Sequence, residues 1–185
     1  METQSNCFVM ADPKKCIGCK ACELACFAVH NKNNNVSSTV GTVEIPVMPR
    51  LYVEEFNGFK MPVQCRHCEN APCANSCAVG AIKLEENKIV VDEKACIGCK
   101  GCLKACPFGA IEITSMYENK KEVKRLNGIK KKVAYKCDLC KESGTPACVK
   151  VCPKDALRLV VPNNEKKIRN KQSAESLLKM LGNYK

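Results

Sequence analysis

The chain has 185 residues, which is enough for one ordinary domain or two small modules. Its formal net charge is +11, hydrophobic residues make up 45% of the chain and aromatic residues only 5%, and tryptophan is absent. The chain contains no run of the roughly 18 apolar residues that a membrane-spanning helix needs, and it opens without an apolar export signal. We therefore expect a cytoplasmic protein without a membrane span.

Cysteine is the unusual part of the composition, with 17 residues. Thiols stay reduced in the cytoplasm, where grouped cysteines hold metal more often than they form disulfides, and an odd count also argues against a disulfide scaffold. Thiolate ligands would cancel much of the positive charge of the chain. The charge is therefore weak evidence for a nucleic-acid partner, and we expect metal sites and no nucleic-acid binding.

Short strands are expected along the chain, several of them in hairpins. Residues 7–10 (CFVM) predict a first strand, and residues 31–42 (NKNNNVSSTVGT) predict a loop. An Asn-Gly hairpin is predicted over 51–64, a second hairpin over 81–91 and a third over 122–136. Each of these hairpins leads directly into a group of cysteines. Two more strands, AIEITSM (110–116) and ALRLVV (156–161), follow later groups.

Two segments of the second half of the chain have alternative interpretations. The basic run Lys120–Lys132 is either a solvated hairpin with charged edges or a docking surface for an acidic partner. In the tail, Ser173 is a candidate helix N-cap and Gly182 a candidate stop. The apolar residues between them have helical spacing: Ala174, Leu177, Leu178 and Leu181. This stripe either folds back onto the chain or binds a neighbouring subunit.

Sixteen of the cysteines form four groups, which we call quartets one to four. They are Cys16, Cys19, Cys22 and Cys26; Cys65, Cys68, Cys73 and Cys77; Cys96, Cys99, Cys102 and Cys106; and Cys137, Cys140, Cys148 and Cys152. Every quartet opens with C-x2-C and closes with C-x3-C. Cys7 is left over, and we interpret it as a small buried residue of the first strand.

The spacing within the quartets indicates [4Fe–4S] clusters that are shared between quartets. The first three cysteines of a quartet can surround one corner of a cubane, while the last lies one helical turn beyond them and points away. Each quartet should therefore give its last thiolate to a partner quartet, and spacing alone leaves the choice of partner open. We expect a short helical turn after each closing C-x3-C. Zinc is the alternative, chiefly at quartet four, because zinc sites favour two C-x2-C pairs with a longer spacer.

Other residues near the quartets carry weaker signals. Gly18 and Gly98 lie between ligands, where they either permit a tight turn or are ordinary loop glycines. His67 lies between Cys65 and Cys68, and we interpret it as solvent-facing or backbone-bonded; the alternative is a histidine that tunes the cluster. His30 shows no signal. The sequence has no nucleophile–base pattern, P-loop or dinucleotide fingerprint, so we expect a non-catalytic chain.

A family resemblance rests on four stretches: ADPKKCIGCKACELAC, CRHCENAPCANSC, CIGCKGCLKACPFGAI and KCDLCKESGTPACVKVCP. Together they resemble the four-cluster electron-transfer subunits of the molybdenum/tungsten oxidoreductase superfamily, from about residue 6 to about residue 162. The stretches are most similar to the small soluble iron–sulfur subunits of formate hydrogenlyase, formate dehydrogenase and hydrogen-dependent carbon dioxide reductase. Phe27 and Ala78 replace the proline that follows the last cysteine of the other two quartets.

The resemblance implies that quartet one pairs with quartet four, and quartet two with quartet three. The implied ligands, called ligand sets 1 to 4, are Cys16, Cys19, Cys22 and Cys152 (set 1); Cys65, Cys68, Cys73 and Cys106 (set 2); Cys96, Cys99, Cys102 and Cys77 (set 3); and Cys137, Cys140, Cys148 and Cys26 (set 4). It also implies an α+β fold of two ferredoxin-like modules, each holding two [4Fe–4S] clusters. The expected boundaries are 6–30 with 131–162 for the outer module, 60–117 for the inserted module, 31–59 and 118–130 for insertions, and 163–185 for a tail with a short amphipathic helix.

The function implied by the resemblance is single-electron relay between a formate dehydrogenase subunit and a hydrogenase or a further iron–sulfur subunit. The alternatives are a free polyferredoxin, an electron-transfer subunit of another molybdenum/tungsten reductase, and, in a different class, a zinc-held scaffold that binds nucleic acid. Self-association or filament formation through the tail helix is a further expectation.

Overall fold

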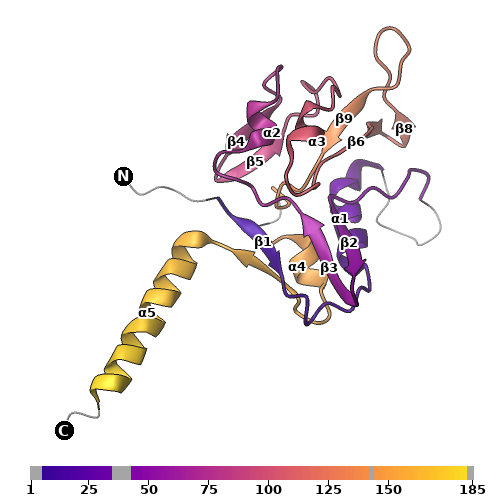
Figure 1. Cartoon of the computed structure of the whole chain (residues 1–185). Coiled ribbons are helices and arrows are strands. Elements are labelled where there is room, and N and C mark those ends of the chain that lie inside the picture. The colour runs from indigo at the N-terminus through magenta and orange to yellow at the C-terminus, as the bar shows by residue number, and fades with distance from the viewer. Residues whose placement is uncertain (1–5, 35–42, 142–143, 183–185) are drawn as a thin grey trace.

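The computed structural model describes residues 6–34, 43–141 and 144–182, and most of the loop predicted over 31–42 lies outside these residues. Within them the chain forms two-stranded sheets, four short or medium helices around the quartets, and one long C-terminal helix (Figure 1). No helix in this part of the chain is long and apolar enough to span a membrane.

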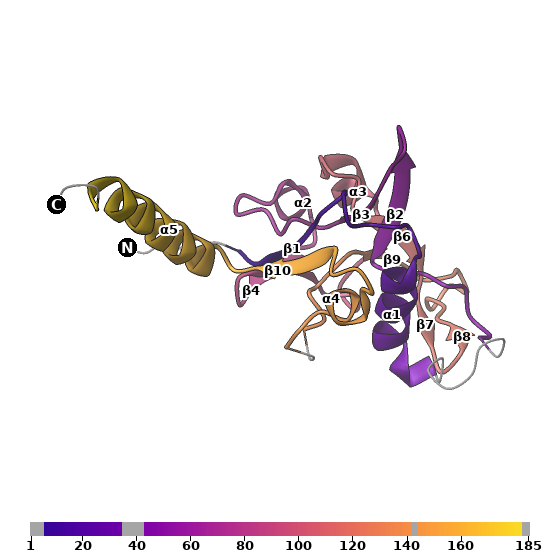
Figure 2. The same cartoon turned by 90° about the horizontal axis from the view of Figure 1, so that it is seen from below.

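The two ends of the cysteine-containing region meet in one sheet. Strand β1 (Phe8–Ala11) pairs antiparallel with β10 (Leu157–Val160), so that Phe8 lies opposite Val160. The two strands lie side by side in both views (Figures 1 and 2). Val9 of β1 is completely buried, which explains why this apolar strand belongs to the core.

Two of the three predicted hairpins are confirmed. Strands β2 (Leu51–Phe56) and β3 (Phe59–Gln64) form one, and β4 (Ile82–Glu85) and β5 (Lys88–Val91) form the other. Asn57 at the first turn has a φ of 49° and its glycine neighbour a φ of 79°, as a turn with two left-handed residues requires. The second strands, β3 and β5, lead into quartets two and three.

The third hairpin prediction is wrong about the strand partner. The chain runs through β6 (Glu112–Ser115), β7 (Tyr117–Glu118), β8 (Lys121–Glu122) and β9 (Lys132–Tyr135), and β9 pairs with β6. The Asn-Gly turn still forms, but it is closed by a single bridge between Lys124 and Lys130. Val133 and Ala134 of β9 are buried, whereas the residues before the turn are largely charged and exposed. Burial of the apolar strand against the core therefore decides the pairing.

A helix carries the third cysteine of every quartet. These helices are α1 (Ala21–His30), α2 (Pro72–Asn75), α3 (Gly101–Ala105) and α4 (Ala147–Val151). We predicted a helical turn after the closing C-x3-C, but each helix begins before it. Helix α1 packs against α4, and α2 packs against α3. A one-turn 3-10 helix, η1 (Lys32–Asn34), follows α1.

The tail helix is longer than predicted. Helix α5 (Pro162–Leu181) begins after Val161, and proline at the first position suits a helix start because its missing N–H would have no partner there. Ser173 therefore lies inside the helix and is not its cap. No residue of α5 is buried, and the helix projects away from the body in both views (Figures 1 and 2). The prediction that the stripe folds back onto the chain is wrong.

Thiols make up much of the buried core. One core cluster combines Val9, Leu51, Leu139 and Leu157 with cysteines of quartets one, two and four. A second combines Ile82, Ile89 and Ile111 with cysteines of quartets two and three. Because large rings are scarce, the interior depends on these small residues and on whatever the thiols bind.

Candidate metal centres

All seventeen cysteines lie in the described part of the chain, and all are free thiols. Those of the quartets are placed by short loops and helix ends. The residue before the second cysteine has a positive φ in all four quartets: 72° at Gly18, 48° at His67, 68° at Gly98 and 60° at Leu139. The four loops thus turn in the same way, although only two of them use glycine.

Two ligand sets are gathered around pockets. Cys16, Cys19, Cys22 and Cys152 all line one pocket, whose other walls include Val53 and Leu157. Cys77, Cys96, Cys99 and Cys102 all line another, together with Ile82 and Ala134. In each case three thiols of one quartet meet the last thiol of a different quartet.

In sets 4 and 2, thiols from different quartets influence one another's pKa within the core. Burial, and then the nearby thiols of Cys140 and Cys148, raise the pKa of Cys26 to about 12. Burial also raises the pKa of Cys73 to about 11, and the thiols of Cys65 and Cys106 contribute in the same direction. Packing agrees with these influences. Cys26, Cys137 and Cys148 share the first core cluster, and Cys106 packs against the second core cluster, which contains Cys73.

Backbone N–H groups point at six of the sulfurs. The donors are Arg50, His67, Ala134, Leu139, Ala147 and Ala156, and the acceptors are Cys26, Cys65, Cys96, Cys137, Cys140 and Cys152, at 3.3–3.5 Å. An N–H donor stabilises a thiolate more than a thiol, and such bonds are a means of tuning iron–sulfur sites.

These observations fit iron–sulfur ligands. Thiols with a raised pKa stay protonated unless a metal replaces the proton. Apolar walls, converging sulfurs and N–H donors together provide the environment in which iron can make that replacement. Cys7 does not join any set: it is half-buried beside the first core cluster, just ahead of β1, rather than buried within it.

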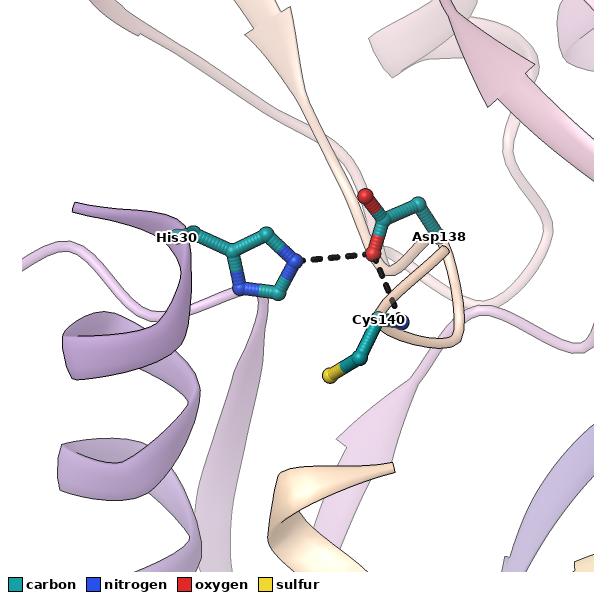
Figure 3. A group of neighbouring side chains, drawn as sticks. All are labelled: His30, Asp138 and Cys140. Atoms are coloured by element: carbon teal, nitrogen blue, oxygen red, sulfur yellow. Dashed lines mark hydrogen bonds and ion pairs between the residues drawn. The ribbon is translucent and has the colours of Figure 1, made fainter. Parts of the chain in front are cut away.

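A polar network beside quartet four was missed by the sequence analysis. His30 Nε2 lies 2.8 Å from Asp138, and Asp138 also accepts the N–H of Cys140 at 2.9 Å (Figure 3). Arg50 binds Asp138 and Glu93, each at 2.9 Å. Burial alone would raise the pKa of Asp138, but His30 and Arg50 hold it well below its usual range.

The ligand atoms of His30, Asp138 and Cys140 lie within 4.8 Å of one another. Because Cys140 is one of the ligands that the family resemblance implies for set 4, we interpret the trio as support for that set rather than as a separate metal site. Spacing offered no signal for it, because His30 and Asp138 are 108 residues apart.

A second polar group lies beside quartet two. His67 is 1% exposed and accepts the N–H of Ile89 at its Nδ1. It is thus backbone-bonded, as one of our two interpretations held, and the solvent-facing alternative is wrong. Burial, and then the charge of Lys136, lower the pKa of His67 to about 3.

Comparison with known proteins identifies the family. Residues 56–162 match the family described as "4Fe-4S dicluster domain". In Escherichia coli (strain K12), the chain is 43% identical to YsaA, covering 83% of this chain and 88% of YsaA. It is 40% identical to the electron transport protein HydN, covering 85% and 90%, and 34% identical to hydrogenase-4 component A, covering 90% and 89%.

Two longer relatives of the same strain, UacF and AegA, match at 40% and 43% identity, and the chain spans only 21% and 22% of their lengths. A solved chain of the benzoyl coenzyme A reductase active-site complex BamBC aligns with a TM-score of 0.39 at 22% identity, covering 94% of this chain and 89% of that one. The family match covers more than half of the chain, and YsaA and HydN match it over most of both lengths: this chain belongs to the 4Fe-4S dicluster domain family.

Proposed function

We propose that this chain is an electron-transfer subunit that holds four [4Fe–4S] clusters, one in each of ligand sets 1 to 4. A bound [4Fe–4S] cluster takes up and releases one electron without exchanging its ligands. The residues of the chain hold the clusters in place, exclude water from them and direct N–H groups at their sulfurs. The chain itself makes and breaks no substrate bonds in this proposal.

One observation carries the proposal: Cys152 lines the same pocket as Cys16, Cys19 and Cys22. A contiguous zinc site would not bring together thiols that are 130 residues apart in the sequence. The pocket at Cys77, Cys96, Cys99 and Cys102 repeats the arrangement. Sharing of the last cysteine between quartets is the feature that two-cluster ferredoxins use.

The module boundaries follow from the same pairing. The outer ferredoxin-like module comprises 6–30 with 131–162, and the inserted module comprises 60–117. Pairing of β1 with β10 and packing of α1 on α4 support the first, and packing of α2 on α3 supports the second. The segments 31–59 and 118–130 are insertions, and 163–185 is the tail.

The exposure of the thiols supports a linear order of clusters. Cys19 of set 1 and Cys99 of set 3 are exposed, whereas Cys65 of set 2 and Cys137 of set 4 are buried in the same core cluster. Helix α1, which carries Cys22, packs against α4, which carries Cys148, and both cysteines lie in the first core cluster; this packing supports placing sets 1 and 4 next to each other. We infer the order 1–4–2–3, with sets 1 and 3 facing partners.

The partners we propose are a molybdenum or tungsten formate dehydrogenase subunit and a hydrogenase, reached from opposite ends of the row. The names of HydN and hydrogenase-4 component A support electron transport and a hydrogenase link; the formate dehydrogenase rests on the motif resemblance alone. Helix α5 supports stable assembly rather than free diffusion, because Leu177, Leu178 and Met180 are all more than half exposed. The helix is also the segment through which we propose self-association.

Anaerobic purification of the tagged chain from its host tests two parts of the proposal, the four [4Fe–4S] clusters and the partner proteins. We expect about sixteen iron and sixteen acid-labile sulfide per chain, with a hydrogenase and a molybdenum- or tungsten-containing protein in the same fractions. A chain that carries zinc and no sulfide would overturn the electron-transfer role. A fully loaded chain that elutes alone would retain that role and identify a free polyferredoxin instead.

A further inference from the structure

Lys136 is a buried amine without an acidic partner in the described part of the chain. It follows β9, immediately precedes Cys137 and is 2% exposed. Its Nζ donates to the carbonyl oxygens of Cys137, at 2.7 Å, and of Ile89. Lysine is rarely buried without a counter-charge because an ammonium loses much hydration. A group that is this costly requires a compensating negative charge nearby.

Lys136 is joined to the loop of quartet two through one residue of β5. The carbonyl of Ile89 accepts from Lys136, and the N–H of Ile89 donates to His67 Nδ1 at 3.0 Å. The N–H of His67 in turn points at Cys65 Sγ at 3.4 Å. We call Lys136, Ile89 and His67 the buried bridge.

The buried bridge spans the interval between ligand sets 4 and 2. One end adjoins Cys137 and the other adjoins Cys65, and both cysteines belong to the first core cluster. The amine of Lys136 hydrogen-bonds the backbone of Cys137 directly, and it is joined to the loop of Cys65 through Ile89 and His67.

Given the proposed function, on which this inference rests, we propose that Lys136 is a positioning residue for electron transfer between the two central clusters. Its charge raises the reduction potentials of the clusters in sets 4 and 2, and its two hydrogen bonds hold the facing loops together. The negative charge of the two cluster sites is thus the counter-charge that the amine lacks.

The sign follows from electrostatics. Reduction adds one negative charge to a cluster, so a nearby cation stabilises the reduced state and raises the potential. A charge in the interior acts with little screening, whereas the many exposed lysines are screened by salt and water. The two central clusters should therefore be reduced more readily than the same sites would be without Lys136.

Redox titration of the fully loaded chain, followed by electron paramagnetic resonance, tests the inference. Lys136→Gln keeps N–H donors for the two carbonyls but removes the charge, and Lys136→Arg keeps the charge. Lys124→Met removes an exposed, screened charge from the hairpin beside quartet three and is the control. For Lys136→Gln we expect two of the four midpoint potentials to fall, with the reduced-to-oxidised ratio at fixed potential dropping about tenfold, which is about 59 mV for a one-electron couple. Lys136→Arg and Lys124→Met should leave all four midpoint potentials unchanged within experimental error.

Four unchanged potentials in a fully loaded Lys136→Gln chain would overturn the inference, as would a shift of the same size in Lys124→Met. If Lys136→Gln fails to load four clusters, loading of Lys136→Arg decides: a charge role requires the arginine variant to load, and its failure would show that only the shape of lysine matters. Iron and sulfide content of the unchanged chain tests the proposed function separately, because a wild-type chain with four clusters satisfies it whatever the variants do.

Discussion

Quartets one and three differ from quartets two and four in the sequence of their opening loops and in the exposure of their cysteines. Quartets one and three have nearly the same sequence, CIGCKACELAC and CIGCKGCLKAC, and their second cysteines are exposed; we call them the outer quartets, and quartets two and four the inner quartets, whichever module they belong to. The inner pair read CRHC and CDLC at their openings, and their first cysteines are buried. The same loop turn is made with glycine outside and with His67 and Leu139 inside.

The difference indicates two ways of supporting a cysteine loop. In the outer quartets the loop needs a positive φ and lies very close to a neighbouring segment of the chain, and glycine permits both because it has no Cβ. The inner loops are held by buried side chains from elsewhere: Arg50 and His30 bind Asp138, and Lys136 and Ile89 hold His67 in place. Substitutions should therefore act through packing and charge at the inner loops and through backbone strain at the outer loops.

The largest difference is expected between an inner and an outer ligand. Cys137 is buried in the core, whereas Cys99 is exposed. Cys137→Ser should lose at least one cluster and lower the temperature at which the 400 nm absorbance bleaches, because an unbound polar group remains in the core. Cys99→Ser should lower it less, and Cys7→Ser should keep full iron content. Equal effects of the first two variants would contradict the distinction.

Arg50 should be the next most sensitive position. Its guanidinium binds two carboxylates and lies 4.4 Å from the ring centre of Tyr135. Arg50→Met leaves Asp138 with only His30 and the N–H of Cys140 as partners. Because breaking a buried pair completely costs about 3–5 kcal/mol, we expect a loss of stability toward the lower end of that range. Arg66 is the matched control, since it contacts the Phe8 ring but pairs with no carboxylate among the described residues, and Arg66→Met should cost about 1 kcal/mol. Thermal bleaching of both loaded variants measures the difference, and a loss for Arg66→Met as large as for Arg50→Met would argue against the network.

Among the loops of the outer quartets, substitution of Gly98 by alanine should be more damaging than the same substitution of Gly18. A Cβ at Gly98 would lie 2.5 Å from the backbone oxygen of Lys132, whereas at Gly18 it would meet only the flexible side chain of Lys60. Both positions have positive φ, so alanine costs about 1–2 kcal/mol at either. Gly98→Ala should lose more iron than Gly18→Ala because backbone cannot move aside as a side chain can. Gly109→Ala, also at positive φ but in open space, measures the conformational cost alone.

The smallest effect concerns the turns that precede the outer quartets. The carboxylate of Asp92 accepts the N–H groups of Lys94 and Ala95, at 2.9 and 3.2 Å, whereas that of Asp12 accepts, among the described residues, just the N–H of Lys14, at 2.9 Å. Asp92→Ala should therefore lower the bleaching temperature slightly more than Asp12→Ala, with no loss of iron from either. The reverse order would show that these carboxylates do not support the turns.

Local patterns were sufficient for much of the fold. The first two hairpins are set by neighbouring residues, so the sequence predicts them. A short helix at each quartet was also expected, but it begins just before the third cysteine rather than after the last one. The pairing of β9 with β6 is different, because the choice depends on which strand can bury Val133 and Ala134. The first half of α5, residues 162–172, has Ile168 as its one large apolar residue, so no apolar stripe marks it and Pro162 is the main local signal for the helix start.

The candidate site also has one part that the sequence predicts, the ligands, and one part that it does not, the side chains that support them. The sixteen candidate ligands are visible as spacings. His30, Arg50 and Asn6, by contrast, are far in sequence from the groups they support, and Lys136 is 47 residues from Ile89, so no local pattern reveals these contacts. Asn6, for example, donates to the carbonyl of His67 at 2.8 Å across 61 residues. Such contacts depend on the folded arrangement of the quartets.

The central claim is that each set combines thiols from two quartets. Electron paramagnetic resonance of the fully reduced, anaerobically loaded chain tests it through paired variants. We predict that Cys152→Ser and Cys16→Ser remove the same spectral component, and that Cys26→Ser and Cys140→Ser remove a different one. Loss of one shared component in Cys152→Ser and Cys140→Ser, with Cys16→Ser affecting another, would contradict the claim.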